Sequence, residues 1–148
     1  MSTDTDEKTL YDIFTLHYII NKVYFKNFEN QYPLEDLNFT HVRTMVTLSF
    51  EQPCTMSTVS EKMGLEKGSF SPVAHHLINK GYVRKRQDTA DKRAYYLELT
   101  QKGKEFTEKV TKDHLIFIEK EIEKFPKLEK DIYRSAIKLI ISMTEKLA

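Results

Sequence analysis

The sequence predicts a mainly α-helical protein with a small antiparallel β-hairpin, and three observations indicate this α+β fold. Over most of the 148 residues, apolar side chains recur at the three- and four-residue spacing of amphipathic helices. Two short segments, residues 82–86 and 95–99, alternate instead at period two, as half-buried strands do. Glycine and proline number only four each, too few for a loop-rich chain.

The composition is that of a soluble globular protein. Hydrophobic residues make up 40% of the chain and charged residues 30%, a balance typical of a domain with a buried core. No apolar run approaches the roughly 20 residues that span a bilayer, and the polar, acidic N-terminus lacks the features of a signal peptide. Cys54 is the only cysteine, so no internal disulfide can form. We therefore expect a single cytoplasmic domain, residues 1–148, without a membrane partner.

The N-terminal half predicts three helices. Residues 6–28 combine helical apolar spacing with acids at the N-terminal end, where they suit the helix dipole. After a loop over residues 29–37, Asn38 is a favourable N-cap for a second helix. Thr55 is placed to cap a short third helix that ends near Met63.

A fourth helix, bounded by two glycines, precedes the hairpin. Gly64 and Gly81 fit the positions just beyond the third and fourth helices, where a positive φ costs little. Over residues 67–80 the predicted buried positions are Phe70, Val73, Ala74 and Leu77. The segment between the two strands, QDTADKRA, is long and polar, which favours a projecting wing over a tight turn.

Pro72 leaves two interpretations of how this fourth helix begins. A proline inside a helix removes one hydrogen bond and costs about 3 kcal/mol. In the first interpretation Ser71 is the N-cap and Pro72 is the first helical residue, a favourable combination. In the second, the helix begins near Lys67 and bends at Pro72.

Beyond the hairpin the chain is predicted to return to helix. Thr100 is the expected N-cap of a helix that ends near residue 125, and Pro126 separates it from a last helix over 128–147. These helices, together with the N-terminal one, carry more apolar surface than a compact core needs, and such a stripe is typical of an interface. A two-fold homodimer is the commonest closed solution. We therefore predict dimerisation helices at 6–28 and 101–147.

Positive charge is concentrated between Lys67 and Arg93. This stretch holds seven Lys or Arg residues and two Asp residues, a net of +5 in a chain whose total is +1. A local surplus of this kind is the expected footprint of a phosphate-binding surface. Nucleic acid is therefore the predicted partner.

Three segments share motifs with a known family. Residues 37–43, LNFTHVR, are similar to the start of its second helix, and the ungapped spacing over residues 65–83 fits its recognition helix. Residues 88–93 match its wing signature D-x-x-D-x-R, and LELT with Gly103 matches the L-x-L-T-x-x-G that follows. Together these motifs resemble the MarR family of winged-helix transcription regulators.

The resemblance implies a winged helix-turn-helix core at residues 36–100, working as a homodimer on a pseudo-palindromic operator in double-stranded DNA. The fourth helix would enter the major groove and the wing the flanking minor groove. In proteins of this family a small ligand or an oxidant often releases the DNA, so the resemblance also allows a small-molecule effector. Its cleft would lie between helices of the dimerisation region and the core, lined by Phe14, His17 and His41.

With its apolar face buried, the fourth helix presents a polar face to the predicted DNA. Lys67 and the hydroxyl side chains suit phosphates, whereas His75, His76 and Asn79 suit base edges. At the wing, Lys92 or Arg93 suits a narrow minor groove. The full predicted DNA-binding set is Thr55, Ser57, Lys67, Ser69, Ser71, Pro72, His75, His76, Asn79, Arg84, Arg86, Lys92 and Arg93.

Other functions have weaker sequence support. Cys54 has no basic residue nearby in sequence, so we expect a small semi-buried side chain rather than a redox sensor. His17, His41 and His114 lack metal-ligand spacing, so no metal or other cofactor is predicted. Nucleophile and phosphate-loop motifs are absent, so the chain is not predicted to be an enzyme. The alternative left open is a dimerisation or adaptor protein whose winged helix no longer reads DNA.

Overall fold

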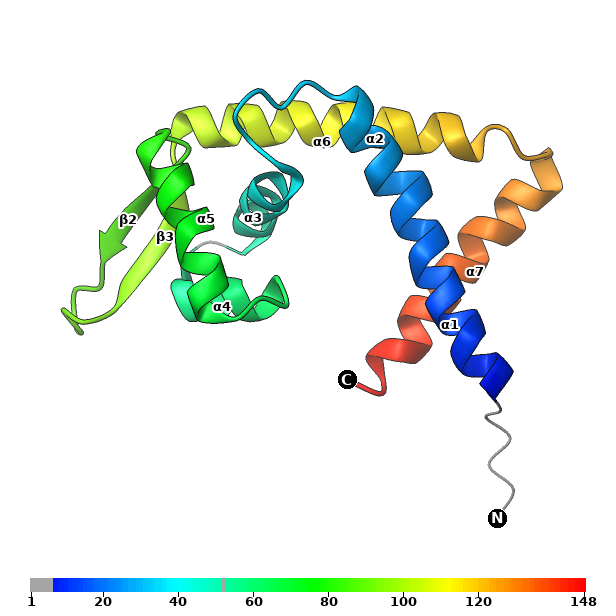
Figure 1. Cartoon of the computed structure of the whole chain (residues 1–148), viewed down its shortest axis with the longest axis horizontal. Helices are drawn as coiled ribbons and strands as arrows, with labels where there is room; N and C mark the ends of the chain where they lie inside the picture. Colours follow the sequence, from blue (N-terminus) through cyan, green and yellow to red (C-terminus); the bar gives the residue numbers. More distant parts are fainter. Residues whose placement is uncertain (1–6, 52) are drawn as a thin grey trace, which may run out of the picture. The chain divides into compact units, whose positions relative to one another are not determined.

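The computed structural model describes residues 7–51 and 53–148 (Figure 1). Asp6, the predicted first residue of the N-terminal helix, and Gln52 lie outside the described residues. The predicted fold class is confirmed, because helices dominate the described chain and its strands form one small antiparallel sheet. The chain divides into two compact units, one ending at Asp113 and the other running from His114 to Ala148.

The predicted N-terminal helix is present, but it is not uniformly α-helical. α1 (Glu7–Ile20) continues into a π-helical segment, η1 (Asn21–Lys26), and then into α2 (Asn27–Gln31). Apolar spacing predicted the helix but carried no sign of the π segment, which forms when the backbone hydrogen bonds shift by one residue. Phe28 is 4% exposed and its ring lies 6.4 Å from that of Phe39, so α2 packs on the next helix.

Three further helices follow where the sequence predicts them: α3 (Phe39–Phe50), α4 (Met56–Lys62) and α5 (Lys67–Asn79). Gly64 and Gly81 have φ of +63° and +78°. This left-handed region favours glycine, so both are confirmed as the residues that end α4 and α5. Figure 1 shows α3, α4 and α5 gathered beside the hairpin.

The predicted N-caps of α3 and α4 are also confirmed. Asn38 Oδ1 accepts a hydrogen bond from the His41 amide at 3.1 Å, and Thr55 Oγ1 accepts one from the Thr58 amide at 3.1 Å. His41 returns the contact, because its Nδ1 accepts a hydrogen bond from the Asn38 amide at 3.0 Å. The pair forms a capping box in which histidine takes the place usually held by Glu or Gln.

The core of the larger unit excludes water almost completely. Phe70 and Leu77 of α5 are 0% exposed and Ala74 is 1% exposed, which confirms the predicted buried face of this helix. Val73 is partly buried against the same cluster. Around them lie Met45, Leu48, Val59, Val83, Leu97 and Leu99. Full burial of a Phe or Leu side chain stabilises the fold by about 1.5–3 kcal/mol, so this cluster determines how α5 is oriented.

The sheet has three antiparallel strands in the order β1-β3-β2: β1 (Cys54–Thr55), β2 (Val83–Gln87) and β3 (Tyr95–Leu99). β2 and β3 are the predicted hairpin, which extends away from the helices in Figure 1. β1 was not predicted from the sequence, because a strand of two residues is too short to show an alternating pattern. In the register of the hairpin, Arg84 lies opposite Glu98.

The C-terminal helices lie close to their predicted bounds. α6 (Gln101–Ile122) follows Thr100, whose Oγ1 accepts a hydrogen bond from the Gly103 amide at 3.1 Å, as expected of an N-cap. α7 (Lys127–Glu145) begins directly after Pro126. In the described chain no helix is long and apolar enough to cross a membrane.

Gly103 marks the place where α6 passes closest to the hairpin. A Cβ at this position would meet the Tyr82 carbonyl oxygen at 2.0 Å and Leu99 Cδ2 at 3.2 Å. The Tyr82 carbonyl is itself held by the Thr100 amide at 3.0 Å, so it cannot easily move aside. A larger residue at position 103 therefore forces the helix away from the sheet.

We predict that Gly103→Ala lowers the free energy of unfolding by about 1–3 kcal/mol, the usual cost of overpacking, in urea denaturation. Gly68→Ala is the matched control, because a Cβ there meets nothing within 4 Å. The control is expected to leave stability unchanged or raise it by up to about 1 kcal/mol. An equal loss in the two variants would contradict this account of Gly103.

Candidate nucleic-acid interface

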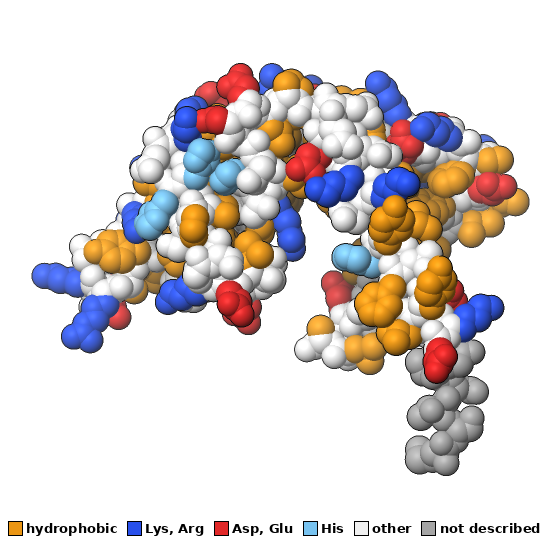
Figure 2. Space-filling view, in the orientation of Figure 1, with side chains coloured by type: hydrophobic (Ala, Val, Ile, Leu, Met, Phe, Trp, Pro, Cys, Tyr) orange, Lys and Arg blue, Asp and Glu red, His pale blue; other side chains and the backbone are white. Residues whose placement is uncertain are grey.

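The polar face of α5 lies at the surface, opposite the face that the core buries. Ser71, His76 and Thr55 are partly buried. The exposed members of the predicted set on α4 and α5 are Ser57, Lys67, Ser69, Pro72, His75 and Asn79. Figure 2 shows histidine side chains on this face of the larger unit. The helix therefore presents a cation, hydroxyl groups and hydrogen-bonding side chains along one side.

Pro72 lies inside α5 rather than at its start. The helix begins at Lys67 with Glu66 as N-cap, so the interpretation in which Ser71 caps the helix is wrong. The core explains the early start, because Phe70 must be helical to share a buried face with Leu77. Pro72 has no N–H to donate, so α5 accepts the loss of one backbone hydrogen bond near its exposed N-terminal end.

His76 is held within the protein, although the sequence analysis assigned it to a base edge. Its Nε2 donates a hydrogen bond to the Asp36 carbonyl oxygen at 3.1 Å, and its ring stacks on that of His41 at 4.5 Å. Lys80, at the end of α5, forms an ion pair with the Asp36 carboxylate, and this hydrogen bond is the main cause that lowers the pKa of Asp36. These contacts tie α5 to the loop that precedes α3.

His41 is part of this anchor. It is 8% exposed and its Nδ1 is occupied by the Asn38 amide. Burial lowers the pKa of the His41 imidazole, and the neighbouring charge of His76 lowers it further. An imidazolium carries protons on both nitrogens, so protonated His41 cannot accept the Asn38 hydrogen bond.

The tip of the wing is organised by the two acids of its sequence motif. Asp88 Oδ1 accepts hydrogen bonds from the Ala90 and Asp91 amides at 2.7 Å, and these bonds lower the pKa of the Asp88 carboxyl. Asp91 Oδ1 accepts one from the Arg93 amide at 2.9 Å. The acids therefore shape the backbone of the turn. Lys92 and Arg93 stay exposed, and no carboxylate of the described residues pairs with either side chain.

Arg84 and Arg86, further down the wing, are paired with a residue that the sequence analysis missed. Glu98 Oε2 accepts a hydrogen bond from Arg84 Nε at 3.1 Å, and Glu98 Oε1 accepts one from Arg86 Nε at 2.6 Å. The alternation of the strands places all three side chains on the same face of the hairpin. The charge count in the sequence ended at residue 93 and so left this carboxylate out.

A cavity of about 680 Å³ lies between the N-terminal helix and α3. Of the three residues predicted to line a ligand cleft, His17 does so, whereas Phe14 and His41 are not among the lining residues. The wall includes His17, Ile20, Asn21, Phe25, Lys26, Glu29, Asn38, Phe39, Thr40 and Arg43, with Met63 and Leu65. It combines aromatic and aliphatic surface with charged and amide groups.

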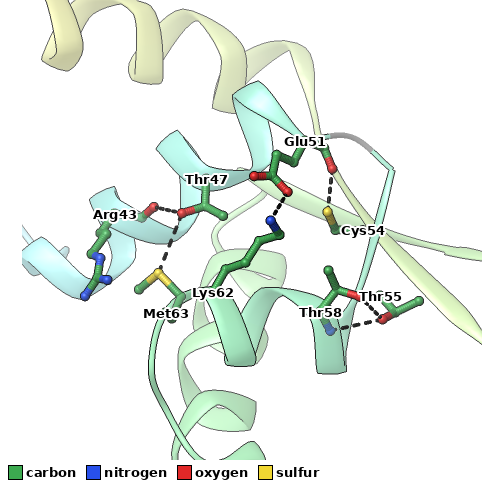
Figure 3. A network of polar contacts seen from close by, with 8 residues as sticks. All are labelled: Arg43, Thr47, Glu51, Cys54, Thr55, Thr58, Lys62 and Met63. Atoms are coloured by element: carbon green, nitrogen blue, oxygen red, sulfur yellow. Dashed lines mark hydrogen bonds and ion pairs between the residues drawn. The ribbon is translucent and has the colours of Figure 1, made fainter. Parts of the chain in front are cut away.

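Cys54 is a buried small side chain, 5% exposed. Its Sγ donates a hydrogen bond to the Glu51 carbonyl oxygen, beside the ion pair of 2.5 Å between Lys62 and the Glu51 carboxylate (Figure 3). Burial, and secondly the Glu51 charge, raise the pKa of the thiol above its usual value. Both effects oppose the exposed thiolate that a redox sensor requires. Within the described residues no group of three His, Cys, Asp or Glu side chains is placed to hold a metal ion.

Comparisons with known proteins address the family directly. The family model described as "MarR family" matches residues 37–95, which contain α3, α4, α5 and the first strand of the hairpin. Residues 37–95 form a MarR-family domain. The HTH-type transcriptional regulator SarZ of Staphylococcus saprophyticus is 27% identical over 93 residues, 63% of this chain and 64% of SarZ. SarZ of Staphylococcus aureus is 25% identical over 89 residues, 60% of each chain, so these matches span less than two thirds of the relatives' length.

Solved structures share the fold of this chain. FabT of Streptococcus pneumoniae, solved in complex with DNA, has a TM-score of 0.74 at 21% identity over 97% of this chain and all of FabT. A mutant of E. coli MarR has a TM-score of 0.75 at 15% identity, covering 86% of this chain and 94% of MarR. At these identities the likeness establishes the winged-helix fold.

The capping role of His41 generates a pH prediction. Because its pKa is lowered in the folded protein, the unfolded chain takes up a proton here first as the pH falls below the ordinary value of 6.5. The contribution of neutral His41 is therefore complete above that pH and is lost as the pH falls through the folded pKa. We predict that the free energy of unfolding decreases as the pH falls below about 6.5, the ordinary value for histidine.

His41→Gln is the matched variant, because glutamine keeps the capping box and does not titrate. It is expected to show a smaller decrease over the same pH range in urea denaturation. The same decrease in wild type and variant would remove His41 as the cause.

Proposed function

We propose that this protein is a transcription regulator that binds double-stranded DNA sequence-specifically, acting as a homodimeric repressor on a pseudo-palindromic operator. One observation carries the proposal: the exposed polar face of α5 and the unpaired cations at the wing tip belong to one compact unit of MarR type. An α-helix fits the major groove, and a wing beside it reaches the flanking groove. FabT, which has a similar fold and was solved in complex with DNA, supports the proposal of DNA binding.

The exposed residues divide by chemistry into two roles. Lys67 and Ser69, in the first turn of α5, suit phosphate oxygens, which also favour the positive end of a helix dipole. His75 and Asn79 carry side chains that can exchange hydrogen bonds with base edges. Lys92 and Arg93 at the wing tip suit the minor groove. His76 positions α5 instead, through its contacts with Asp36 and His41.

Apolar faces support the homodimer. α1 buries none of its residues, and α7 buries none either. Exposed large hydrophobic residues include Leu10, Tyr11, Ile13, Phe14 and Tyr18 of α1 and Leu128, Ile132, Leu139 and Met143 of α7. Figure 2 shows such side chains along α1. Association with a second copy of the chain would remove these apolar side chains from water. We therefore assign the helices of residues 6–28 and 101–147 to a dimer interface, and residues 36–100 to the DNA-binding core.

The cavity supports a small-molecule effector. Its lining pairs the aromatic rings of Phe25 and Phe39 with the charged groups of Lys26 and Arg43, which suits an amphiphilic molecule. Asn38 lines the cavity and also caps α3. A ligand there would touch the helix terminus to which α5 is anchored.

The alternative, an adaptor whose winged helix no longer reads DNA, is less well supported. An adaptor has no need for Lys92 and Arg93 on a turn whose backbone is held by two aspartates.

Selection of bound sequences from a random DNA pool tests the two functions. The regulator is expected to enrich a palindrome whose half-sites are about one helical turn apart, bound by a species with twice the chain's mass in sedimentation. Failure to enrich any sequence would favour the adaptor.

The exposed cations Lys92 and Arg93 at the wing tip lead to a prediction about how DNA affinity depends on salt concentration. Arg93→Ala should weaken operator binding and flatten the plot of log affinity against log salt concentration by up to about 0.9 for each lost phosphate contact. Lys127→Ala is the control, because it removes an exposed cation from α7. An unchanged slope in Arg93→Ala would exclude the wing tip from phosphate binding.

The two adjacent histidines of α5 should behave differently. His75→Ala is expected to lose about 1–3 kcal/mol of discrimination at one base pair, measured as the affinity ratio of operator to single-base variants. His76→Ala is expected to lower the unfolding midpoint, because it removes the stack on His41 and the hydrogen bond to Asp36. An equal loss for His75→Ala on operator and random DNA would make His75 a phosphate contact or a packing residue.

A further inference from the structure

One face of the hairpin carries a network of charged side chains. Glu98 binds Arg84 and Arg86 with one carboxylate oxygen each, and a second Arg84 nitrogen, Nη2, lies 3.0 Å from the oxygen that Arg84 Nε contacts. The Arg86 guanidinium lies 5.2 Å from the centre of the Tyr96 ring, and Tyr96 hydrogen-bonds the Asp88 carboxylate. Both cations on this face thus pair with one carboxylate, that of Glu98.

The members of the network differ in how far they reach solvent. The Glu98 side chain is 15% exposed, whereas those of Arg84 and Arg86 are 66% and 44% exposed. The carboxylate is therefore the enclosed centre, and the two guanidinium groups fold over it from the neighbouring strand. The contacts with Arg86 and Arg84 lower the pKa of Glu98, so its negative charge persists at neutral pH.

Pairing with a carboxylate reduces the electrostatic affinity of an arginine side chain for DNA phosphates. Sequence-independent affinity arises when Lys and Arg side chains neutralise phosphates and release the counterions around them. A guanidinium bound to Glu98 already has its preferred planar partner. Even where other N–H groups of the guanidinium can still reach a phosphate, the Glu98 charge beside it offsets the attraction and places a carboxylate close to the polyanion.

We propose that Glu98 is a specificity-determining residue of the interface: it holds Arg84 and Arg86 back from DNA phosphates, so that the tip of the wing contacts the backbone and these two arginines do not. This inference rests on the proposed DNA-binding function. It replaces the interpretation of Arg84 and Arg86 as direct DNA contacts with one in which they are restrained. The restraint suppresses binding to random sequence more than binding to the operator, where base contacts of α5 add affinity.

The test compares wild type with Glu98→Gln on operator and random DNA over a range of salt concentrations. Freeing both arginines should steepen the salt slope by up to about 1.8, which is two phosphate contacts at about 0.9 each. That slope corresponds to an additional loss of affinity of up to about 12-fold between about 50 and about 200 mM salt. The ratio of operator to random affinity should fall at low salt. An unchanged slope and ratio would overturn the inference.

Two further variants separate local release from net charge. Glu123→Gln makes the same change in charge and frees Lys130, its partner at 2.6 Å, outside the hairpin. It is expected to keep the wild-type slope. Arg84→Gln and Arg86→Gln, added to Glu98→Gln, should restore the wild-type slope, because the freed cations are gone. A steep slope in Glu123→Gln, or no restoration in the triple variant, would contradict the role of Glu98.

Arg84→Gln alone keeps the test decisive if Glu98→Gln does not fold. Arg86 still pairs with Glu98 in this variant, so the salt slope should equal that of wild type, in contrast to the flattening expected for Arg93→Ala. A flatter slope would show that Arg84 binds phosphate and would overturn the inference. If wild type itself binds no DNA, both the proposed function and this inference fail, whereas normal wild-type binding with these contrary slopes removes only the role of Glu98.

Discussion

The burial of one face of α5 is the constraint on which the rest of the structure depends. Phe70 and Leu77 pack in one cluster with Leu97 and Leu99 of β3, so the same core holds the helix and the wing. Because protein interiors are close-packed, α5 cannot rotate without opening a cavity beneath it. The polar face is therefore fixed in direction by residues that never reach the surface. This packing holds the side chains of the proposed DNA interface in position before any DNA binds.

Electrostatic pairing then determines which cations remain available. Glu98 engages Arg84 and Arg86, and Asp36 engages Lys80, so three of the basic residues that stood out in the sequence are occupied. Pairs this exposed contribute little to stability. Of the seven basic residues between Lys67 and Arg93, these pairs leave Lys67, Lys85, Lys92 and Arg93 without a carboxylate partner among the described residues. In a chain with a net charge of +1, this placement agrees with the proposal that the protein binds DNA at defined positions and has little general attraction to a polyanion.

The N-terminus of α3 joins several features. Asn38 caps the helix, lines the cavity and shares its hydrogen bonds with His41. His41 in turn stacks on His76 of α5. A change in protonation or in cavity occupancy at this terminus would thus act on groups in direct contact with the helix proposed to read DNA. The capping box is formed by neighbouring residues, but His41 also connects it to His76, which is distant in the sequence.

The sequence by itself determined the elements that depend on residues a few positions apart. Helical spacing, the caps at Asn38 and Thr55, the buried face of α5 and the hairpin all follow from such local chemistry, and the structure confirms them. β1 and the π-helical segment η1 were not predicted, because such short or irregular elements show no periodic pattern of apolar residues. Pro72 stayed ambiguous in the sequence because its local preference opposes the burial of Phe70.

Only the tertiary structure decided which side chains of the candidate interface are free. His76 meets the Asp36 carbonyl from 40 positions away, and Arg84 meets Glu98 from 14. Side-chain chemistry at each position was readable, but a partner distant in the chain is chosen by packing and strand register. The sequence therefore identified a winged-helix type of domain, and the fold distinguished the residues that hold it together from those that stay exposed on the proposed interface.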